Sequence, residues 1–243
     1  MPWVKSIQRA AKIAVDYWYD GIEALLTQKT LQQLSSGETD LVSAKVLSLH
    51  QPFRETGILV DKLGFLELRP FPSEWNYEAY LALANRIGVP IVLHINDPHF
   101  DSLRWAIAVS AKSVKPVLEF NTFGVAFKKD FRPEDLRDLA QEMDCGICFD
   151  VGYAYQAGWD ILEAWDLLAD KTTIIHFYDV KAEIKGMFSK NLTPGTGVLP
   201  LTEFLVNLRE SHWRGQITLE LLPEPLANHK RACAFTRAFL YPS

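Results

Sequence analysis

The chain has 243 residues, enough for one large domain or two small ones. Hydrophobic residues make up 48% and charged residues 23%, which is typical of a soluble globular protein rather than a disordered one. The formal net charge of −5 argues against a protein that binds nucleic acid through a broadly basic surface. No apolar run approaches the roughly 20 residues that cross a bilayer, and no signal-peptide pattern opens the chain, so we expect a cytoplasmic protein without a membrane partner.

The first part of the chain contains a helix and three short apolar segments. The pattern predicts a helix over 6–18, and an apolar segment, DGIEALLT, follows at 20–27. A strand is predicted over 44–52, AKVLSLHQP. The segment GFLELRP, residues 64–70, is a candidate additional strand whose place in a sheet the sequence does not indicate.

From residue 77 onward, helices and strands alternate regularly. Helical spacing of apolar residues predicts helices over 77–88, 101–113, 133–143, 160–170, 200–212 and 228–240. Short apolar runs predict strands over 89–97, 114–122, 145–152, 171–179 and 215–223. Strands that are apolar throughout and separated by helices are typical of a parallel sheet buried on both faces. Because no linker interrupts the pattern, we expect one domain over 1–243.

A polar side chain of a type that binds metals stands at the end of six strands: His50, His94, Glu119, Asp150, His176 and Glu220. In a closed barrel the carboxyl ends of the strands meet on one face, where active sites of such folds lie. An open sheet would spread the same six residues along a line. The pattern therefore predicts a TIM-type (β/α) barrel with seven parallel strands, or eight if 64–70 is included.

Three of these strand-end residues are carboxylates that would repel one another without a cation. A divalent ion held by Glu119, Asp150, Glu220 and neutral His176 removes most of the free-energy cost of this repulsion. Three oxygens and one nitrogen suit Mn²⁺, our first choice, and also Mg²⁺, Co²⁺ or Zn²⁺. The three cysteines form no disulfide framework, and we expect the CxxC pair, Cys145 and Cys148, to be small core residues rather than metal ligands.

Seven segments in this order resemble the xylose isomerase-like TIM barrel superfamily of sugar phosphate isomerases and epimerases. They are DGIEALL, SLHQPF, LEFNT, FDVGYAYQAG, HFYDVK, PGTG and ITLEL. The resemblance implies that Glu119, Asp150, His176 and Glu220 bind one divalent metal ion. It also implies that Glu119 and Glu220 move a proton at the carbon beside a sugar carbonyl, through an enediolate.

The resemblance also suggests how a sugar or sugar phosphate is bound. His50 and His94 are expected to line the mouth of the barrel and contact the substrate. Asp179 matches the aspartate of the family's H-x-x-D segment and is a candidate to orient His176 or bind a sugar hydroxyl. The glycines of PGTG could hold a substrate phosphate or form a plain turn. Relatives in the family often form homo-oligomers.

The sequence departs from the family pattern at two places. Tyr153 stands where the family usually has a histidine, and a tyrosine can hydrogen-bond or stack on a sugar but cannot act as a base at neutral pH. Family members also begin with a strand, for which this chain offers only MPWVK, so the N-terminal strand is expected to be absent or atypical. Because of both departures, a non-catalytic member of the family that binds a metal or small ligand is an alternative function.

Two further activities compete with the isomerase or epimerase. A dehydratase would begin with the same proton abstraction. A phosphodiesterase like the apurinic endonucleases would use positions such as His50 and His94 for additional metal ions. That activity needs a histidine in place of Tyr153 and a D-x-H segment after His176, neither of which the sequence contains.

Overall fold

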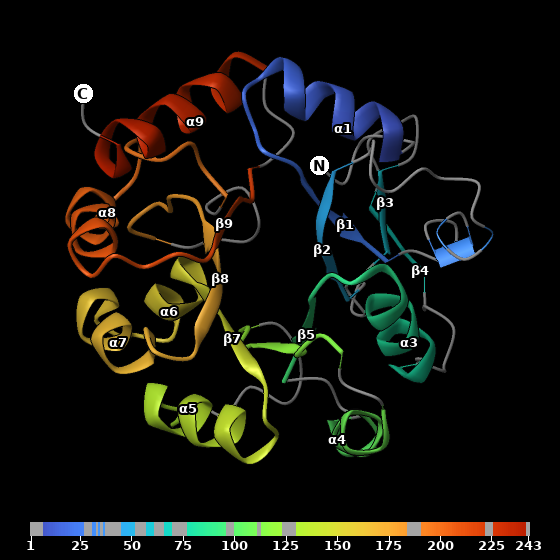
Figure 1. The fold of residues 1–243 in the computed structure, drawn as a ribbon. Coiled ribbons are helices and arrows are strands. Elements are labelled where there is room, and N and C mark those ends of the chain that lie inside the picture. The colour runs from blue at the N-terminus through green and yellow to red at the C-terminus, as the bar shows by residue number, and fades with distance from the viewer. Residues whose placement is uncertain are drawn as a thin grey trace.

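The computed structural model describes residues 7–26, 31–32, 34, 36, 45–51, 57–60, 66–69, 77–95, 100–110, 113–122, 130–183, 191–221 and 226–241. Within these residues, seven parallel strands form one sheet in the order β1-β2-β5-β6-β7-β8-β9. The sheet curls into a nearly closed barrel, and helices surround it on the outside (Figure 1). The predicted TIM-type barrel is confirmed.

The barrel strands are short and mostly apolar because one face packs inside the barrel and the other packs against the helices. Their bounds are β1 (Ile22–Leu25), β2 (Val46–His50), β5 (Ile91–His94), β6 (Val117–Glu119), β7 (Gly146–Asp150), β8 (Thr172–Phe177) and β9 (Gln216–Leu219). Four of them end at one of the six strand-end residues predicted to meet: His50, His94, Glu119 and Asp150. His176 is the last residue but one of β8, and Glu220 follows β9 directly.

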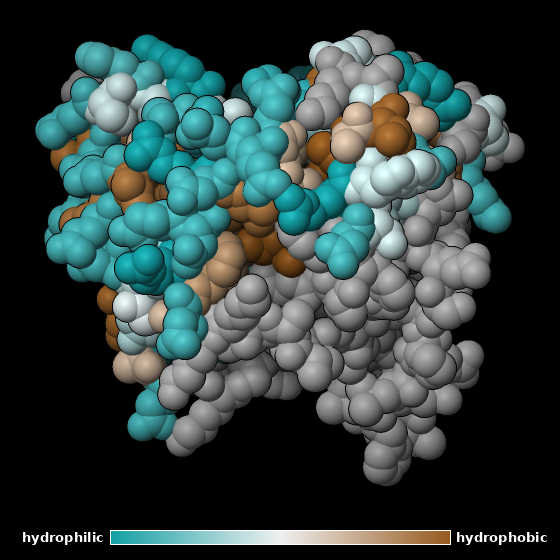
Figure 2. Space-filling view, turned by 90° about the horizontal axis from the view of Figure 1, so that it is seen from below, coloured by the Kyte–Doolittle hydropathy of each residue, from teal (hydrophilic) through white to brown (hydrophobic). Residues whose placement is uncertain are grey.

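The helices bury one side against the sheet and expose the other. Their bounds are α1 (Ile7–Asp16), α3 (Tyr77–Ile87), α4 (Phe100–Val109), α5 (Pro133–Glu142), α6 (Val151–Gln156), α7 (Ile161–Leu168), α8 (Leu201–Glu210) and α9 (Leu226–Leu240). The described surface seen in Figure 2 is mainly hydrophilic, with smaller hydrophobic groups. Among the described residues, none of the helices is both long and apolar enough to cross a bilayer.

Helix α7 shows how sequence, capping and packing fix one helix on the barrel. The side chain of Asp160 accepts hydrogen bonds from the backbone N–H groups of Leu162 and Glu163, which satisfies donors that the first turn leaves unpaired. On the inner side, the buried Trp165 ring lies 6.0 Å from Phe149 of β7 and 5.3 Å from Phe204 of α8. Aromatic contacts of this kind join two helices and a strand into one core.

The candidate strand at 64–70 does not enter the barrel. Its residues form β4 (Leu66–Arg69), which pairs antiparallel with β3 (Gly57–Val60) in a separate two-stranded sheet. The two strands are close in sequence, so an antiparallel pair forms locally, whereas a place in the parallel sheet would require a crossover connection. The count of barrel strands in the described part of the chain is therefore seven. The predicted atypical N-terminal strand concerns residues 1–6, which lie outside the described residues.

The two ends of the described chain are joined by side chains that precede β1 and side chains of α9. The Tyr19 hydroxyl donates to the backbone oxygen of His229 at 2.9 Å, and the Arg237 guanidinium donates to the backbone oxygen of Trp18 at 2.9 Å. Arg237 also pairs with Asp20 at 3.4 Å. These contacts hold the approach to β1 against the last helix.

The interior of the barrel has two layers, because side chains alternate along each strand. The upper layer contains the strand-end residues. Two positions earlier on β5–β8 lies an apolar cluster of Val92, Val117, Cys148 and Ile174. The corresponding positions on β2 and β9, Ser48 and Thr218, are polar. The lower layer is thus apolar on one side of the barrel and polar on the other.

Candidate active site

The carboxylate of Glu119 lies at the centre of the strand-end residues. Its Oε1 is 2.6 Å from Nδ1 of His176, and its Oε2 is 2.9 Å from Nε2 of His94 and 3.7 Å from Nε2 of His50. All four side chains are buried. Four strands thus bring three imidazoles around one carboxylate, as the strand-end pattern predicted for this face of the barrel.

The Nδ1 atom of His176 is the point where the four predicted metal ligands approach one another. Beyond Glu119, it lies 3.5 Å from Oε1 of Glu220 and 3.9 Å from Oδ2 of Asp150. The side chain of Glu220 is 23% exposed, whereas those of Glu119 and Asp150 are 1% or less exposed. Of these carboxylates, Glu220 is therefore the one that a molecule entering from solvent can reach.

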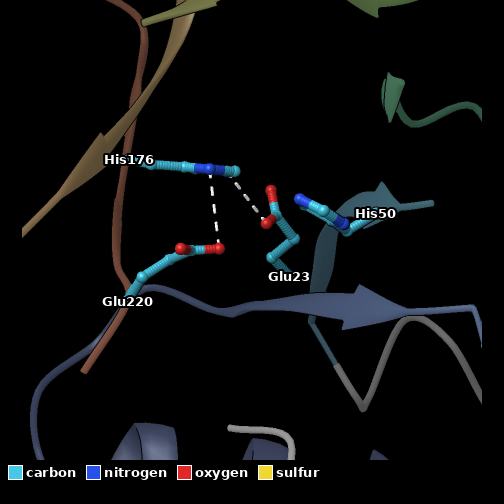
Figure 3. A group of neighbouring side chains, drawn as sticks. All are labelled: Glu23, His50, His176 and Glu220. Carbon is cyan, nitrogen blue, oxygen red and sulfur yellow. Dashed lines mark ion pairs between the residues drawn. The ribbon is translucent and has the colours of Figure 1, made fainter. Parts of the chain in front are cut away.

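A fifth acidic residue, Glu23, belongs to the site and was missed by the sequence analysis. Its Oε1 lies 3.1 Å from Nε2 of His176, on the opposite side of the ring from Glu119. Figure 3 shows the ion pairs of His176 with Glu23 and with Glu220, and places His50 on the far side of Glu23 from His176. Glu23 stands inside β1 rather than at its end, so a search for polar residues at strand ends passes over it. The available signal was a single carboxylate within the apolar run IEALL.

Asp150 is held by the element that follows its strand. Its Oδ1 accepts hydrogen bonds from the backbone N–H of Tyr153 at 2.7 Å and from the hydroxyl of Tyr178 at 2.8 Å. The first contact caps helix α6. Gly152 makes the second possible, because a Cβ at this position would lie 2.2 Å from the Tyr178 ring. The other oxygen, Oδ2, is buried and has no hydrogen-bond partner among the described residues.

Burial and charge act in opposite directions on Glu119 and His176. Burial alone would raise the pKa of Glu119, but the charge and hydrogen bond of His176, with those of His50 and His94, bring it well below the usual value. Burial would lower the pKa of His176, but the surrounding groups, including Glu220, Glu23 and Glu119, raise it well above the usual value. Without a metal ion, these contacts favour the protonated, positively charged form of the His176 imidazole.

The pKa of Asp150 moves in the opposite direction from that of Glu119. Burial, followed by the negative charges of Glu119 and Glu220, raises it from 3.8 to about 8. Burial opposes protonation of His50, but the hydrogen bond and charge of Glu119 more than offset it and raise its pKa to about 9. A raised pKa of a buried carboxyl group beside two other carboxylates is typical of a functional site.

Three overlapping groups of side chains could hold a metal ion among the described residues. They are Glu23, His50, His176 and Glu220; His50, His94 and Glu119; and Glu119, Cys148 and His176. Asp150 is in none of the three, although its Oδ2 lies 3.9 Å from Nδ1 of His176. Cys145 and Cys148 are buried free thiols, as expected, but Cys148 also reaches the site, with its sulfur 3.7 Å from Glu119.

Tyr153 and Asp179 were predicted to contact substrate, and both side chains are buried. The Tyr153 side chain is buried at the start of α6, directly after Asp150. Burial, followed by the charge of Asp150, raises the pKa of Tyr153 well above its usual value, so its hydroxyl stays neutral. Asp179 is buried below the glycine loop. A contact of either residue with substrate stays a prediction.

The carboxylate of Asp179 organises the loop before α8. It accepts hydrogen bonds from four backbone N–H groups, those of Val180, Gly195, Gly197 and Leu199, at 2.8 to 3.1 Å. Gly197 is required here, because a Cβ would lie 2.1 Å from the backbone oxygen of Val180. The N–H groups of the two glycines are thus directed at Asp179, which supports the turn interpretation of PGTG over phosphate binding.

Replacing Asp179 with alanine is expected to destabilise the protein by about 2–4 kcal/mol, because four N–H donors lose a charged acceptor. Thermal unfolding and limited proteolysis of the loop at 191–200 measure the effect. Asp166→Ala on the exposed side of α7 is the matched control. A melting temperature of Asp179→Ala within 1 °C of the control would contradict this role for Asp179.

A comparison with protein families finds that the family model described as xylose isomerase-like TIM barrel matches residues 76–239. The chain belongs to this family. The resemblance inferred from the seven segments is thereby confirmed. No curated protein sequence matches the chain at a significant level.

Solved structures of xylose isomerase-like barrels resemble this chain over nearly its whole length. A D-psicose 3-epimerase from Clostridium cellulolyticum H10, solved with D-tagatose, is 13% identical with a TM-score of 0.70, covering 98% of this chain and 95% of that chain. A 3-keto-D-glucoside 4-epimerase from E. coli is 17% identical with a TM-score of 0.67, covering 97% and 95%. The IOLI protein with a bound zinc atom is 16% identical with a TM-score of 0.66, covering 96% and 92%. At these identities the likeness shows the fold.

Proposed function

We propose that the protein is a divalent-metal-dependent isomerase or epimerase of a small keto sugar or sugar phosphate, folded as a single domain. The observation that supports this most directly is the approach of Glu119, Asp150 and Glu220, from three different strands, to Nδ1 of His176. The epimerases among the similar structures support the reaction class.

Two observations support a divalent ion at the carboxylates around Nδ1 of His176. Asp150 directs a buried oxygen, Oδ2, toward His176 without a hydrogen-bond partner among the described residues. The pKa of Asp150, raised to about 8 by burial and by Glu119 and Glu220, reflects a shortage of positive charge at the same place. Glu119, Asp150, His176 and Glu220 would hold the ion, and Mn²⁺, Mg²⁺, Co²⁺ and Zn²⁺ all accept such a set. When bound, the ion would supply Lewis-acid polarisation of a substrate carbonyl.

Glu220 and Glu119 would move the proton, and their surroundings suit different parts of that task. Glu220 is partly exposed, so its carboxylate can approach the carbon beside the carbonyl of an entering sugar. Glu119 is buried, and His94, His50 and His176 contact it. These contacts fix its orientation and favour its ionised form, so it would receive or return a proton at a defined atom.

His50 and His94 would restrain Glu119 at Oε2, whereas His176 contacts Oε1. The Nδ1 atom of His50 contacts the backbone oxygen of Gln51 at 2.6 Å, and the backbone N–H of His94 donates to the side chain of Gln51 at 3.0 Å. Gln51 therefore links the two histidines at the mouth of the barrel. Their predicted contact with substrate is part of this proposal.

Metal content per chain tests the proposal directly. The protein is stripped with a chelator, equilibrated separately with Mn²⁺, Co²⁺, Mg²⁺ and Zn²⁺, freed of excess ion and measured by elemental analysis. We expect about one tightly held ion for at least one metal, and turnover in a screen of keto sugars with that ion. Absence of a bound ion for all four metals, in protein shown to be folded, would overturn the metal-dependent mechanism.

A further inference from the structure

The two ring nitrogens of His176 face different carboxylates on opposite sides of the ring. Nδ1 lies 2.6 Å from Oε1 of Glu119. Nε2 lies 3.1 Å from Oε1 of Glu23, and Figure 3 draws this second contact. The two nitrogen lone pairs of an imidazole point away from each other, so one ring cannot bind the same ion through both. An ion bound at Nδ1 therefore leaves Glu23 outside its ligands, although Glu23 is close enough to His176 to belong to one of the possible metal groups.

Glu23 is fixed in place by a chain of polar contacts in the lower layer of the barrel. Its Oε2 accepts a hydrogen bond from the hydroxyl of Ser48 at 2.7 Å. The amide of Gln216 donates to the Ser48 oxygen at 2.7 Å and to Oγ1 of Thr218 at 2.8 Å. Three strands, β1, β2 and β9, thus hold this carboxylate. It points at His176 from a position where its side chain is only 7% exposed.

Burial gives Glu23 a strong requirement for hydrogen-bond donors. A buried carboxylate is costly unless donors replace the water it has lost. Ser48 donates a hydrogen bond to Oε2 of Glu23, and Nε2 of His176 lies 3.1 Å from Oε1 as an ion-pair contact. A proton on Nε2 satisfies this requirement, while a bare Nε2 would place its lone pair against a negative oxygen. Glu23 therefore favours the form of His176 that carries its proton on Nε2.

We propose that Glu23 is a positioning residue: it holds a proton on Nε2 of His176 and fixes the ring, so that the Nδ1 lone pair faces Glu119, Asp150 and Glu220. This inference rests on the proposed metal site, for which it identifies a supporting residue that does not itself bind the ion. A carboxylate in this position orients a ligating histidine and raises its basicity. Loss of such a partner typically costs 10–100-fold in metal affinity.

The test compares Glu23→Gln with wild-type protein and with Glu203→Gln, an exposed glutamate in the first turn of α8. Zn²⁺ affinity is measured by competition with a chromophoric chelator. In ¹⁵N-labelled, Zn²⁺-loaded protein, the imidazole spectrum reports which nitrogen of His176 binds the ion and which carries hydrogen. A His176→Gln sample assigns the signals, and the melting temperature of each metal-free variant shows that it is folded.

The expected result is a loss of about 10–100-fold in Zn²⁺ affinity for Glu23→Gln, with no change for Glu203→Gln. In wild-type protein the spectrum should show zinc at Nδ1 and hydrogen at Nε2, and the Nε2–H signal should move or vanish in Glu23→Gln. Ser48→Ala keeps the Glu23 carboxylate but removes one of its hydrogen-bond donors. Its Zn²⁺ affinity should fall by a smaller factor, about 2–10. It also provides the readout if Glu23→Gln does not fold.

Two results would overturn the inference. One is unchanged affinity and an unchanged His176 spectrum in Glu23→Gln, or in Ser48→Ala if only that variant folds. The other is zinc bound at Nε2, which would make Glu23 a metal ligand. If the wild-type chain binds no ion, the proposed function fails separately. In that case the spectrum of the metal-free protein tests the role of Glu23. If the Nε2–H signal of His176 moves in Glu23→Gln, Glu23 holds this proton; if the signal stays unchanged, it does not.

Discussion

Glu220→Gln is expected to lower kcat by about 10²–10⁴-fold on the keto sugar that the screen identifies. The amide keeps the size of the side chain and can still approach an ion through its oxygen, but it cannot accept a proton. The expectation rests on Glu220 being the partly exposed carboxylate at His176, within 3.5 Å of Nδ1. Exchange of deuterium from solvent into the carbon beside the carbonyl measures the proton transfer itself.

The partner variant, Glu119→Gln, separates the two proposed proton carriers. Both variants should lose turnover, whereas Glu203→Gln on the exposed side of α8 should keep it. If one carboxylate removes the proton and the other returns it, one of the two variants can still exchange deuterium without completing the reaction. Wild-type turnover in both Glu119→Gln and Glu220→Gln would rule out carboxylate-mediated proton transfer.

Asp150→Asn is expected to weaken metal binding strongly and, at the same time, to stabilise the metal-free protein above pH 8. The first effect follows because an amide replaces a negatively charged ligand. The second follows from the pKa of Asp150, which burial and the charges of Glu119 and Glu220 raise to about 8. The Oδ1 contacts with Tyr153 and Tyr178 can be kept by the asparagine oxygen.

The direction of the pH dependence follows from this raised pKa. A carboxyl group whose pKa is higher in the folded than in the unfolded state contributes stability below its unfolded pKa, near 4. It loses that contribution as pH rises through its folded pKa, about 8. Asparagine does not ionise, so the advantage of Asp150→Asn should increase from pH 5 to pH 9 in the absence of metal.

Thermal unfolding of the metal-free proteins at several pH values checks this expectation. A gain of about 1 kcal/mol raises the melting temperature by roughly 2–4 °C for a chain of this size. Asp166→Asn, on the exposed side of α7, is the control, and its difference from wild type should stay constant with pH. A difference for Asp150→Asn that shrinks toward pH 9 would contradict the raised pKa, and unchanged metal content would remove Asp150 from the proposed ligands.

The barrel and most of its mouth could be predicted from the sequence because both depend on local patterns. Apolar runs that end in a polar residue mark strands buried on two faces, and barrel closure then brings their ends together. His94, Glu119 and His176 meet for this reason. The order of residues along each strand is enough to place these side chains at the same end of the barrel.

The features that were missed depend on contacts between distant segments. Glu23 lies in the middle of β1 and reaches His176 from the layer below, which no strand-end rule indicates. Asp179 follows His176 at the spacing of a family motif, but the motif does not indicate that four backbone N–H groups of the loop after Asp179 donate to its carboxylate. The segment at 66–69 has the composition of a barrel strand, and only its antiparallel partner at 57–60 removes it from the barrel.

The contacts between α9 and the approach to β1 make the candidate site depend on a helix that contributes no residue to it. Tyr19, Trp18 and Asp20, which directly precede β1, are held by His229 and Arg237 of α9. A chain shortened after β9 would retain Glu23, Glu119, Asp150, His176 and Glu220. It would nevertheless lose the contacts that hold the start of the strand carrying Glu23, so a minimal fragment with an intact candidate site must extend through α9.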